Sequence, residues 1–170
     1  MIAVLSAIII LIPNSYVNAQ NIEQSLSSLR GINKAGVIIE KVGQVLYDNG
    51  IKDDDFKKDI VEKLDYAGIT VLSNPEMHNL PGSPYLYINI GAVKSKTEDF
   101  YAVSLSLEFR QDVNLSRNPK QKYYGAATWS DSNVGIFTKD KLNDIKDYAK
   151  KMVDKFVKDY LKANKIGESK

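Results

Sequence analysis

A regular alternation of apolar and polar side chains over residues 101–115 constrains the fold more than any other feature of the sequence. The apolar positions of this segment are Tyr101, Val103, Leu105, Leu107, Phe109, Val113 and Leu115. Successive side chains of a β-strand point to opposite faces of its sheet, so the pattern predicts one strand with a buried face and a wet face. Strands of this kind are typical of antiparallel sheets.

The predicted strand is too long for an ordinary domain to hold without distortion. Its 15 residues would span roughly 50 Å at about 3.3 Å per residue, whereas a domain of about 150 residues is about 40 Å across. We therefore expect a bend or bulge near Gln111, or a hairpin that projects beyond the body. A turn is expected at residues 117–120, and the projecting tip would carry Arg117, Lys120 and Lys122.

Two segments show the spacing of amphipathic helices. In the first, residues 53–67, Asp53, Asp54 and Asp55 suit the N-cap and first turn, and Gly68 is the expected terminating residue. Its apolar stripe consists of Phe56, Ile60, Leu64 and Ala67. The second, residues 139–163, has a stripe of Leu142, Ile145, Ala149, Met152, Phe156 and Tyr160. This stripe favours packing on a sheet, and a membrane-surface helix is the alternative.

Further strands are expected at residues 36–42, 69–73, 85–93 and 122–130. Residues 74–84 contain three prolines and a glycine and are expected to be an irregular loop. The element order is then β-α-β-β-β-β-α. An α+β two-layer sandwich satisfies these patterns, with a mainly antiparallel sheet and both helices packed on one face. We expect this single domain at residues 20–165 and a frayed tail at 166–170.

The first 19 residues carry no charge, and 14 of them are apolar. An apolar run that ends at Pro13, with small residues before Gln20, is typical of a secretory signal peptide cleaved after Ala19. The run is shorter than the roughly 20 residues that a membrane-spanning helix needs, so an uncleaved anchor is the weaker alternative. The sequence therefore predicts a periplasmic or secreted bacterial protein, with no transmembrane segment after cleavage.

The composition excludes several classes of function. The chain has 23 Lys and Arg against 21 Asp and Glu, a net charge of +2, which gives no electrostatic basis for binding nucleic acid. It has no Cys, which excludes a thiolate nucleophile, Cys-ligated zinc and a lipid-modified cysteine. The single histidine, His78, is expected to be an exposed loop residue, because no serine-nucleophile motif accompanies it. No metal site and no cofactor is predicted, and we expect a protein that is not an enzyme.

Two patterns leave a glycan-acting hydrolase as the alternative. Glu108 and Asp112 lie on the wet face of the long strand, and glycan hydrolysis uses a pair of carboxyl groups. Cross-strand pairing with Lys120 or Lys122 is the simpler interpretation. The second pattern is an aromatic platform for a glycan or peptide, and the alternative is that tyrosine is simply common in half-buried sheets. Its members would be Tyr85, Tyr87, Tyr101, Tyr123, Tyr124 and Trp129.

Three segments resemble small secreted bacterial proteins of unassigned function. They are PYLYIN at residues 84–89, AATWS at 126–130 and VDKFVKDYL at 153–161. The order of elements also resembles that of the lipopolysaccharide-assembly accessory lipoprotein LptE and related envelope proteins, in which a helix-backed sheet is a docking body. This second resemblance covers most of the chain after residue 19 as architecture, without a diagnostic motif or the lipid-modified cysteine. It implies an accessory role in the envelope.

A polar sheet face that nothing in the chain is predicted to cover favours a non-enzymatic binding or envelope-assembly accessory module. Its contact surface is expected on the open sheet face and the hairpin tip. The residues proposed for this surface are Ser104, Ser106, Glu108, Arg110, Arg117 and Lys120. The partner would be an envelope protein or a glycan.

Overall fold

The computed structural model of the chain describes residues 23–166. The predicted signal peptide and residues 167–170 of the predicted tail lie outside the described residues. Two long helices and five strands make up most of this part of the chain. The elements are β1 (Lys34–Ile39), α2 (Gln44–Tyr47), α3 (Asp54–Tyr66), β2 (Thr70–Leu72), α4 (Asn74–His78), β3 (Tyr85–Lys94), β4 (Phe100–Leu115), β5 (Asn118–Thr138), the 3-10 helix η1 (Lys139–Asp144) and α5 (Ile145–Ala163).

The five strands form one sheet in the order β2-β1-β3-β4-β5. β1 pairs in parallel with β2 and with β3. The longer pairings, between β3 and β4 and between β4 and β5, are antiparallel. The predicted α+β fold with a mainly antiparallel sheet is therefore confirmed, and β2 and β5 are its edge strands.

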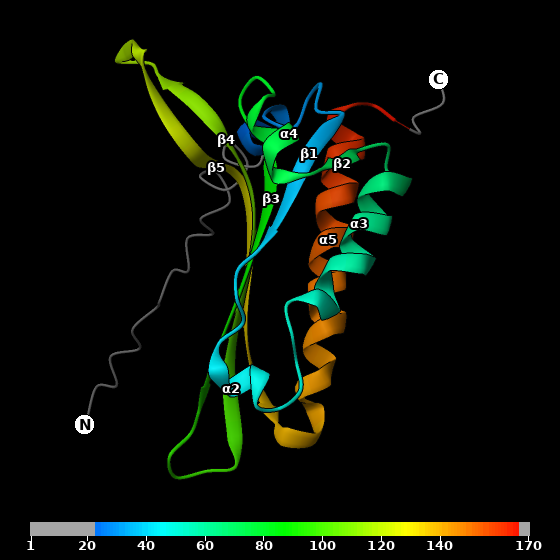
Figure 1. Cartoon of the computed structure of the whole chain (residues 1–170), viewed down its shortest axis with the longest axis vertical. Coiled ribbons are helices and arrows are strands. Elements are labelled where there is room, and N and C mark those ends of the chain that lie inside the picture. The colour runs from blue at the N-terminus through cyan, green and yellow to red at the C-terminus, as the bar shows by residue number, and fades with distance from the viewer. Residues whose placement is uncertain (1–22, 167–170) are drawn as a thin grey trace, which may run out of the picture.

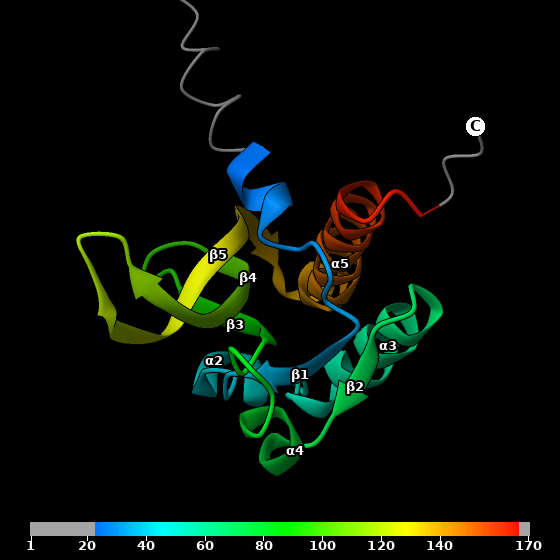
Figure 2. The same ribbon diagram turned by 90° about the horizontal axis from the view of Figure 1, so that it is seen from above.

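The helices α3 and α5 lie side by side on one face of the sheet (Figure 1, Figure 2). Between them and the sheet is the core, which contains five of the seven apolar positions of the predicted alternation: Tyr101, Val103, Leu105, Leu107 and Phe109. Val113 and Leu115, beyond the first register shift, are only half-buried. The ring of Phe156 in α5 stacks on Phe109, with centroids 5.6 Å apart, and meets Trp129 edge-on at 5.1 Å. The apolar stripe of α5 is thus buried against the sheet, which confirms the prediction that this helix packs on a sheet.

Ion pairs join α3 and α5 along their polar flanks. Lys146 lies 3.1 Å from Asp55, and Lys150 lies 2.7 Å from Asp59. The backbone N–H of Lys52 and the Lys146 ammonium both hold the pKa of Asp55 below its usual value. The bond from Lys150 does the same for the pKa of Asp59. These charged groups stabilise the helix layer on its solvent side.

One of the two predicted ends of α3 is confirmed in its detail, and the other differs. Gly68 has φ +86°, and the Ile69 N–H donates to the Leu64 carbonyl at 2.9 Å, so the helix ends at the predicted glycine. At the other end Asp53 occupies the N-cap but makes no capping hydrogen bond with its side chain. Instead the Asp55 carboxylate accepts from the backbone N–H of Lys52 at 2.9 Å.

The long strand β4 is distorted near Gln111, where a bulge was predicted from its length. The pairing of β4 with β5 shifts register after Phe109, between Gln111 and Val113, and again after Asn114. Beyond these shifts the end of β4 and the start of β5 leave the body as a projecting two-stranded hairpin (Figure 1). Both the bulge near Gln111 and the projecting hairpin are confirmed.

The segment 74–84 is not wholly irregular, because it begins with the short helix α4. Ser73 and Glu76 form a capping box, and the Ser73 N–H donates to the Glu76 carboxylate at 3.0 Å. Pro75 is in the first turn, where a missing N–H costs nothing. His78 is the last residue of α4 and is exposed, so it is a helical rather than a loop residue.

The predicted bounds of two strands were wrong. β1 runs over residues Lys34–Ile39 rather than 36–42. β5 begins at Asn118, inside the turn predicted at 117–120, and extends far beyond residue 130, to Thr138. The second half of β5, rich in Ser, Asp, Asn and Gly, has weak strand propensity of its own. It is a strand because it pairs with β4 as far as Phe100. The predicted second helix begins as η1 and becomes α-helical at Ile145.

Candidate functional site

The face of β3, β4 and β5 opposite α3 and α5 is the open face. It consists of cross-strand rows, read through β3, β4 and β5: Val93, Ala102 and Ile136; Gly91, Ser104 and Val134; Asn89, Ser106 and Ser132; Tyr87, Glu108 and Ser130. Four of the six predicted contact residues, Ser104, Ser106, Glu108 and Arg110, lie in one column along β4. They are exposed or half-buried.

One end of the open face is apolar. Val93, Val134 and Ile136 are 70%, 80% and 71% exposed. Val93 and Ile136 flank Ala102 in one row, and Val134 lies in the next row. Adjacent exposed aliphatic side chains of this kind mark interaction sites. The sequence interpretation missed Val134 and Ile136 because it ended the strand at residue 130.

The other end of the open face is built around Arg110. Its Nε donates to Glu108 at 2.6 Å, and its guanidinium lies 4.0 Å from the centre of the Tyr87 ring. Partial burial lowers the pKa of Arg110, but the bonds to Glu108 and Tyr85 outweigh it, and the net shift is upward. The Tyr87 hydroxyl donates to the Glu40 carboxylate, which raises the pKa of that tyrosine. The arginine is therefore a fixed, half-buried cation on this face.

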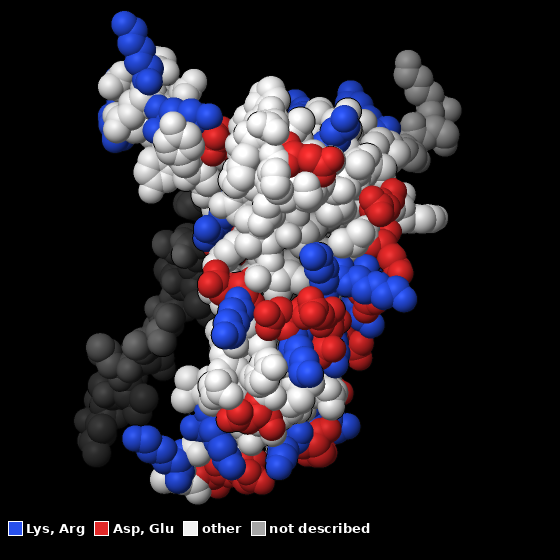
Figure 3. Space-filling model, in the orientation of Figure 1, with Lys and Arg blue, Asp and Glu red and all other residues white. Residues whose placement is uncertain are grey.

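Arg117 and Lys120 do not join the open face. Both are exposed and lie beyond the register shifts, on the projecting hairpin. Cations gather at its end in Figure 3, at the upper left, and acidic side chains lie nearer its base. The single contact surface predicted from the sequence is thus two surfaces, the open face and the hairpin tip.

The base of the hairpin is held by Asp112. Its carboxylate lies 2.8 Å from Lys122 and accepts from the Gly125 N–H at 3.1 Å, and its side chain is only 6% exposed. The Asp112 N–H donates to the Gly82 carbonyl at 2.7 Å. The Lys122 bond is the main reason that the pKa of Asp112 is below its usual value. Gly125 has φ +61° and lies over the Tyr85 hydroxyl, where a side chain would collide.

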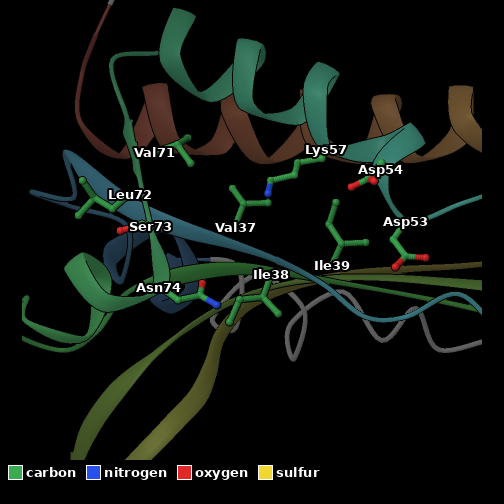
Figure 4. A pocket seen from close by; sticks show the side chains of 10 residues that line it. All are labelled: Val37, Ile38, Ile39, Asp53, Asp54, Lys57, Val71, Leu72, Ser73 and Asn74. Atoms are coloured by element: carbon green, nitrogen blue, oxygen red, sulfur yellow. The ribbon is translucent and has the colours of Figure 1, made fainter.

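A hollow of about 470 Å³ lies beside β1, away from both surfaces (Figure 4). It exists because β2 pairs only with residues 34–36 of β1, so that the last three residues of β1 have a register partner on the β3 side alone. Lys57 reaches from α3 over its floor (Figure 4). Its lining residues are Val37, Ile38, Ile39, Asp53, Asp54, Lys57, Val71, Leu72, Ser73 and Asn74. No sequence signal indicated where β2 would end, and the hollow was not predicted.

The residues considered for a hydrolase are dispersed. Asp112 pairs with Lys122, as the simpler interpretation expected, whereas Glu108 pairs with Arg110 of its own strand. Tyr101 and Trp129 are 3% and 4% exposed, so they belong to the core. The strand aromatics are thus divided among the core, the open face and the hairpin and do not form the platform considered from the sequence.

Two negative findings concern the part of the chain that the structure describes. Within residues 23–166, no three His, Asp or Glu side chains are grouped so that they could hold a metal ion. No helix in the same range is long and apolar enough to cross a membrane.

Comparison with known proteins gives only remote similarity. No protein-family model matches the chain, and no curated protein does. Among solved structures, the PelC dodecamer from Paraburkholderia phytofirmans is 11% identical with a TM-score of 0.40, over 77% of this chain and 89% of that one. A minor lipoprotein from Acinetobacter baumannii is 9% identical with a TM-score of 0.34, over 77% of this chain and 92% of that one. Function must therefore be argued from the surfaces of this chain.

Proposed function

We propose that the chain is a non-enzymatic docking module that binds a partner protein through its open face. The observation that carries this proposal is the exposed aliphatic group Val93, Val134 and Ile136 on a sheet face opposite the helix layer. Burying this group would remove apolar surface from water, which is the main favourable contribution to protein association. Because these three side chains stay exposed, they contribute almost nothing to the free energy of unfolding.

The composition of the open face suits a protein better than a glycan or a small ligand. Its rows change from aliphatic through small and polar at Ser106 to charged at Arg110. An apolar patch beside polar groups is the usual anatomy of a protein interface, and half-buried arginines often anchor such interfaces. Within residues 23–166, the hollow of about 470 Å³ beside β1 and a second of about 530 Å³ between α3 and α5 are lined by residues of β1, β2, α3, α5 and the start of α4, not by the open face.

We place this docking function in the bacterial envelope, in the periplasm. The support for this placement is the signal peptide predicted at residues 1–19. An accessory role in envelope assembly follows from the architectural resemblance noted above and rests on it. The ion-pairing of Glu108 and Asp112 supports a binding role over hydrolysis, because each carboxylate already has a structural cation.

Site-specific photocrosslinking in intact cells tests the docking proposal. A photoreactive amino acid replaces Ser104, in the middle of the open face, and in a matched control it replaces Lys158, which is exposed on α5. We expect a discrete crosslinked product from position 104, with the partner identified by mass spectrometry, and at least a ten-fold lower yield from position 158.

Three results would contradict the proposal. Equal yields at the two positions would show that the open face has no special contact. A product with twice the mass of the chain would show self-association in place of a separate partner. A crosslink only to polysaccharide would assign the face to a glycan.

A further inference from the structure

The projecting hairpin combines positive charge with exposed aromatic side chains along its length. Between Asp112 and Asp131 the sequence has three cations, Arg117, Lys120 and Lys122, and no carboxylate. Among the described residues, neither Arg117 nor Lys120 has an ion-pair partner, whereas Lys122 is paired with Asp112. The chain as a whole is close to neutral, at +2, so this concentration of charge is local.

Two tyrosines accompany these cations. Tyr123 is 58% exposed and Tyr124 is 73% exposed, and the Lys122 ammonium lies 5.0 Å from the centre of the Tyr124 ring. In the register, Tyr123 is opposite Val113, which is half-buried. Tyrosine has an apolar ring and a polar hydroxyl, and it favours the boundary between water and an apolar phase.

The hairpin has a fixed direction. Asp112 ties its base to Lys122, Gly125 and the Gly82 carbonyl. The amide of Gln111 donates to Thr128 Oγ1 at 2.9 Å and to the Ser28 carbonyl at 3.2 Å. The cations and tyrosines are therefore presented together on a projection whose base is held by several bonds, and binding costs less ordering entropy than it would for a loose loop.

The shape of the hairpin limits what it can bind. It is a convex finger that stands away from the body (Figure 1, Figure 3), so it suits an extended surface better than a small ligand that needs to be enclosed. Arg117 and Lys120, which have no ion-pair partner among the described residues, favour an anionic surface. The exposed tyrosines add a preference for an interface with an apolar interior.

We propose that the hairpin tip binds the surface of a membrane that contains anionic phospholipid. Arg117 and Lys120, close to the turn, would contact the phosphate groups. Tyr123 and Tyr124, on the flank of the hairpin between Lys122 and Gly125, would lie beside the headgroups. This inference goes beyond the proposed docking function and does not depend on it, because the open face and the tip share no residue. Together the two surfaces would allow the module to hold a partner protein next to a membrane.

Vesicle co-sedimentation of the chain from Gln20 onward, without the predicted signal peptide, tests whether the hairpin tip binds membranes. The vesicles contain phosphatidylcholine alone or with increasing phosphatidylglycerol, at low and at physiological salt. The test variant is Arg117→Gln with Lys120→Gln. The matched control is Lys96→Gln with Lys141→Gln, which removes the same charge from two exposed positions, one in the turn between β3 and β4 and one in η1. Both follow the end of the sheet at which Lys94 pairs with Tyr101 and Phe100 with Thr138.

We expect the wild-type chain to bind anionic vesicles more strongly as phosphatidylglycerol increases and more weakly as salt increases. Each cation near an anionic surface contributes about five-fold in affinity, so the tip variant should lose roughly 25-fold and the control less than about two-fold. Tyr123→Ala with Tyr124→Ala should also weaken binding to anionic vesicles. Circular dichroism of every variant checks that the fold is intact.

The proposal is overturned if the tip variant binds as the wild type does, or if the control loses as much affinity as the tip variant. A soluble polyanion, dextran sulfate, distinguishes lipid from other anionic polymers. If dextran sulfate binds the tip as tightly per charge as the vesicles do, and the tyrosine variant binds it unchanged, the tip is a polyanion site and the assignment to a membrane is wrong.

Discussion

The two faces of one strand show how differently the molecule uses its side chains. Phe137 and Ile136 are neighbours on β5, yet Phe137 is 8% exposed and Ile136 is 71% exposed. Phe137 packs edge-on against Tyr148 of α5, with ring centroids 5.6 Å apart. Ile136 stands in the apolar row of the open face. Both residues are apolar, so hydrophobicity alone does not separate core from surface, and only the helix layer makes the difference.

The comparison separates what stabilises the domain from what is available for binding. Side chains on the helix face pack against α3 and α5 and contribute to the free energy of unfolding. Aliphatic side chains on the open face contribute little, because they have nearly the same exposure folded and unfolded. The first two predictions below contrast a change on one face with a change on the other, and the third compares two carboxyl groups of α3.

The largest contrast is expected between two truncations to alanine. Phe156→Ala empties the space between Phe109 and Trp129, and the free energy of unfolding should fall by about 3–5 kcal/mol. Ile136→Ala removes an exposed side chain and should cost less than about 1 kcal/mol. Urea denaturation of both variants measures the difference. Equal losses would mean that Ile136 belongs to the core.

A smaller contrast is expected between two polar bonds. The indole N–H of Trp129 donates to Asp159 of α5 at 3.0 Å, and Trp129 is 4% exposed. Asp159→Ala leaves this buried donor without its partner and should cost about 1–2 kcal/mol. Glu108→Ala breaks a half-exposed pair with Arg110 and should cost less than about 1 kcal/mol. If thermal unfolding shows a greater loss of stability for Glu108→Ala than for Asp159→Ala, the open face rather than the helix face stabilises the domain, and the account is wrong.

The smallest expected effect is on the loss of stability at acid pH. Asp55 and Asp59 have pKa values lowered by their bonds, so the unfolded chain binds protons more readily than the folded one. Their stabilisation is complete above about pH 5, since the ordinary pKa of Asp is about 3.9. It is lost as the pH falls through the lowered values.

Melting temperatures between pH 7 and pH 2 measure this effect. In Asp59→Asn the melting temperature should fall slightly less steeply below pH 5, because the variant has no carboxyl group at position 59 to take up a proton. The same slope in Asp59→Asn and wild type would show that the ion pair with Lys150 contributes nothing measurable. The matched control is Asp65→Asn, because Asp65 is exposed and has no ion-pair partner within residues 23–166, and its substitution should leave the slope unchanged.

Much of the fold could be predicted because its strongest patterns are local. The alternation along residues 101–109 and the helical stripe through Phe156 each repeat with the period of their element. The capping box of α4 was also visible in the sequence, but the prolines of that segment drew the interpretation toward a loop. The second half of β5 was not predictable in this way, because its strand structure comes from pairing with β4 rather than from its own residues.

The candidate site could be predicted only along one strand. Ser104, Ser106, Glu108 and Arg110 share a face because alternation places them there. What surrounds them comes from distant parts of the chain. The Glu40 carboxylate reaches Tyr87 from 47 residues away in the sequence, and Ile136 enters the open face through a register that no local pattern specifies.

The most direct test of the open face measures stability and partner binding in one variant. Ile136→Lys places a charge in the apolar row without touching the helix layer. In the chain with the photoreactive residue at position 104, it should reduce crosslinking at least ten-fold, while the free energy of unfolding changes by less than about 1 kcal/mol. An undiminished crosslink at unchanged stability would contradict docking through the open face.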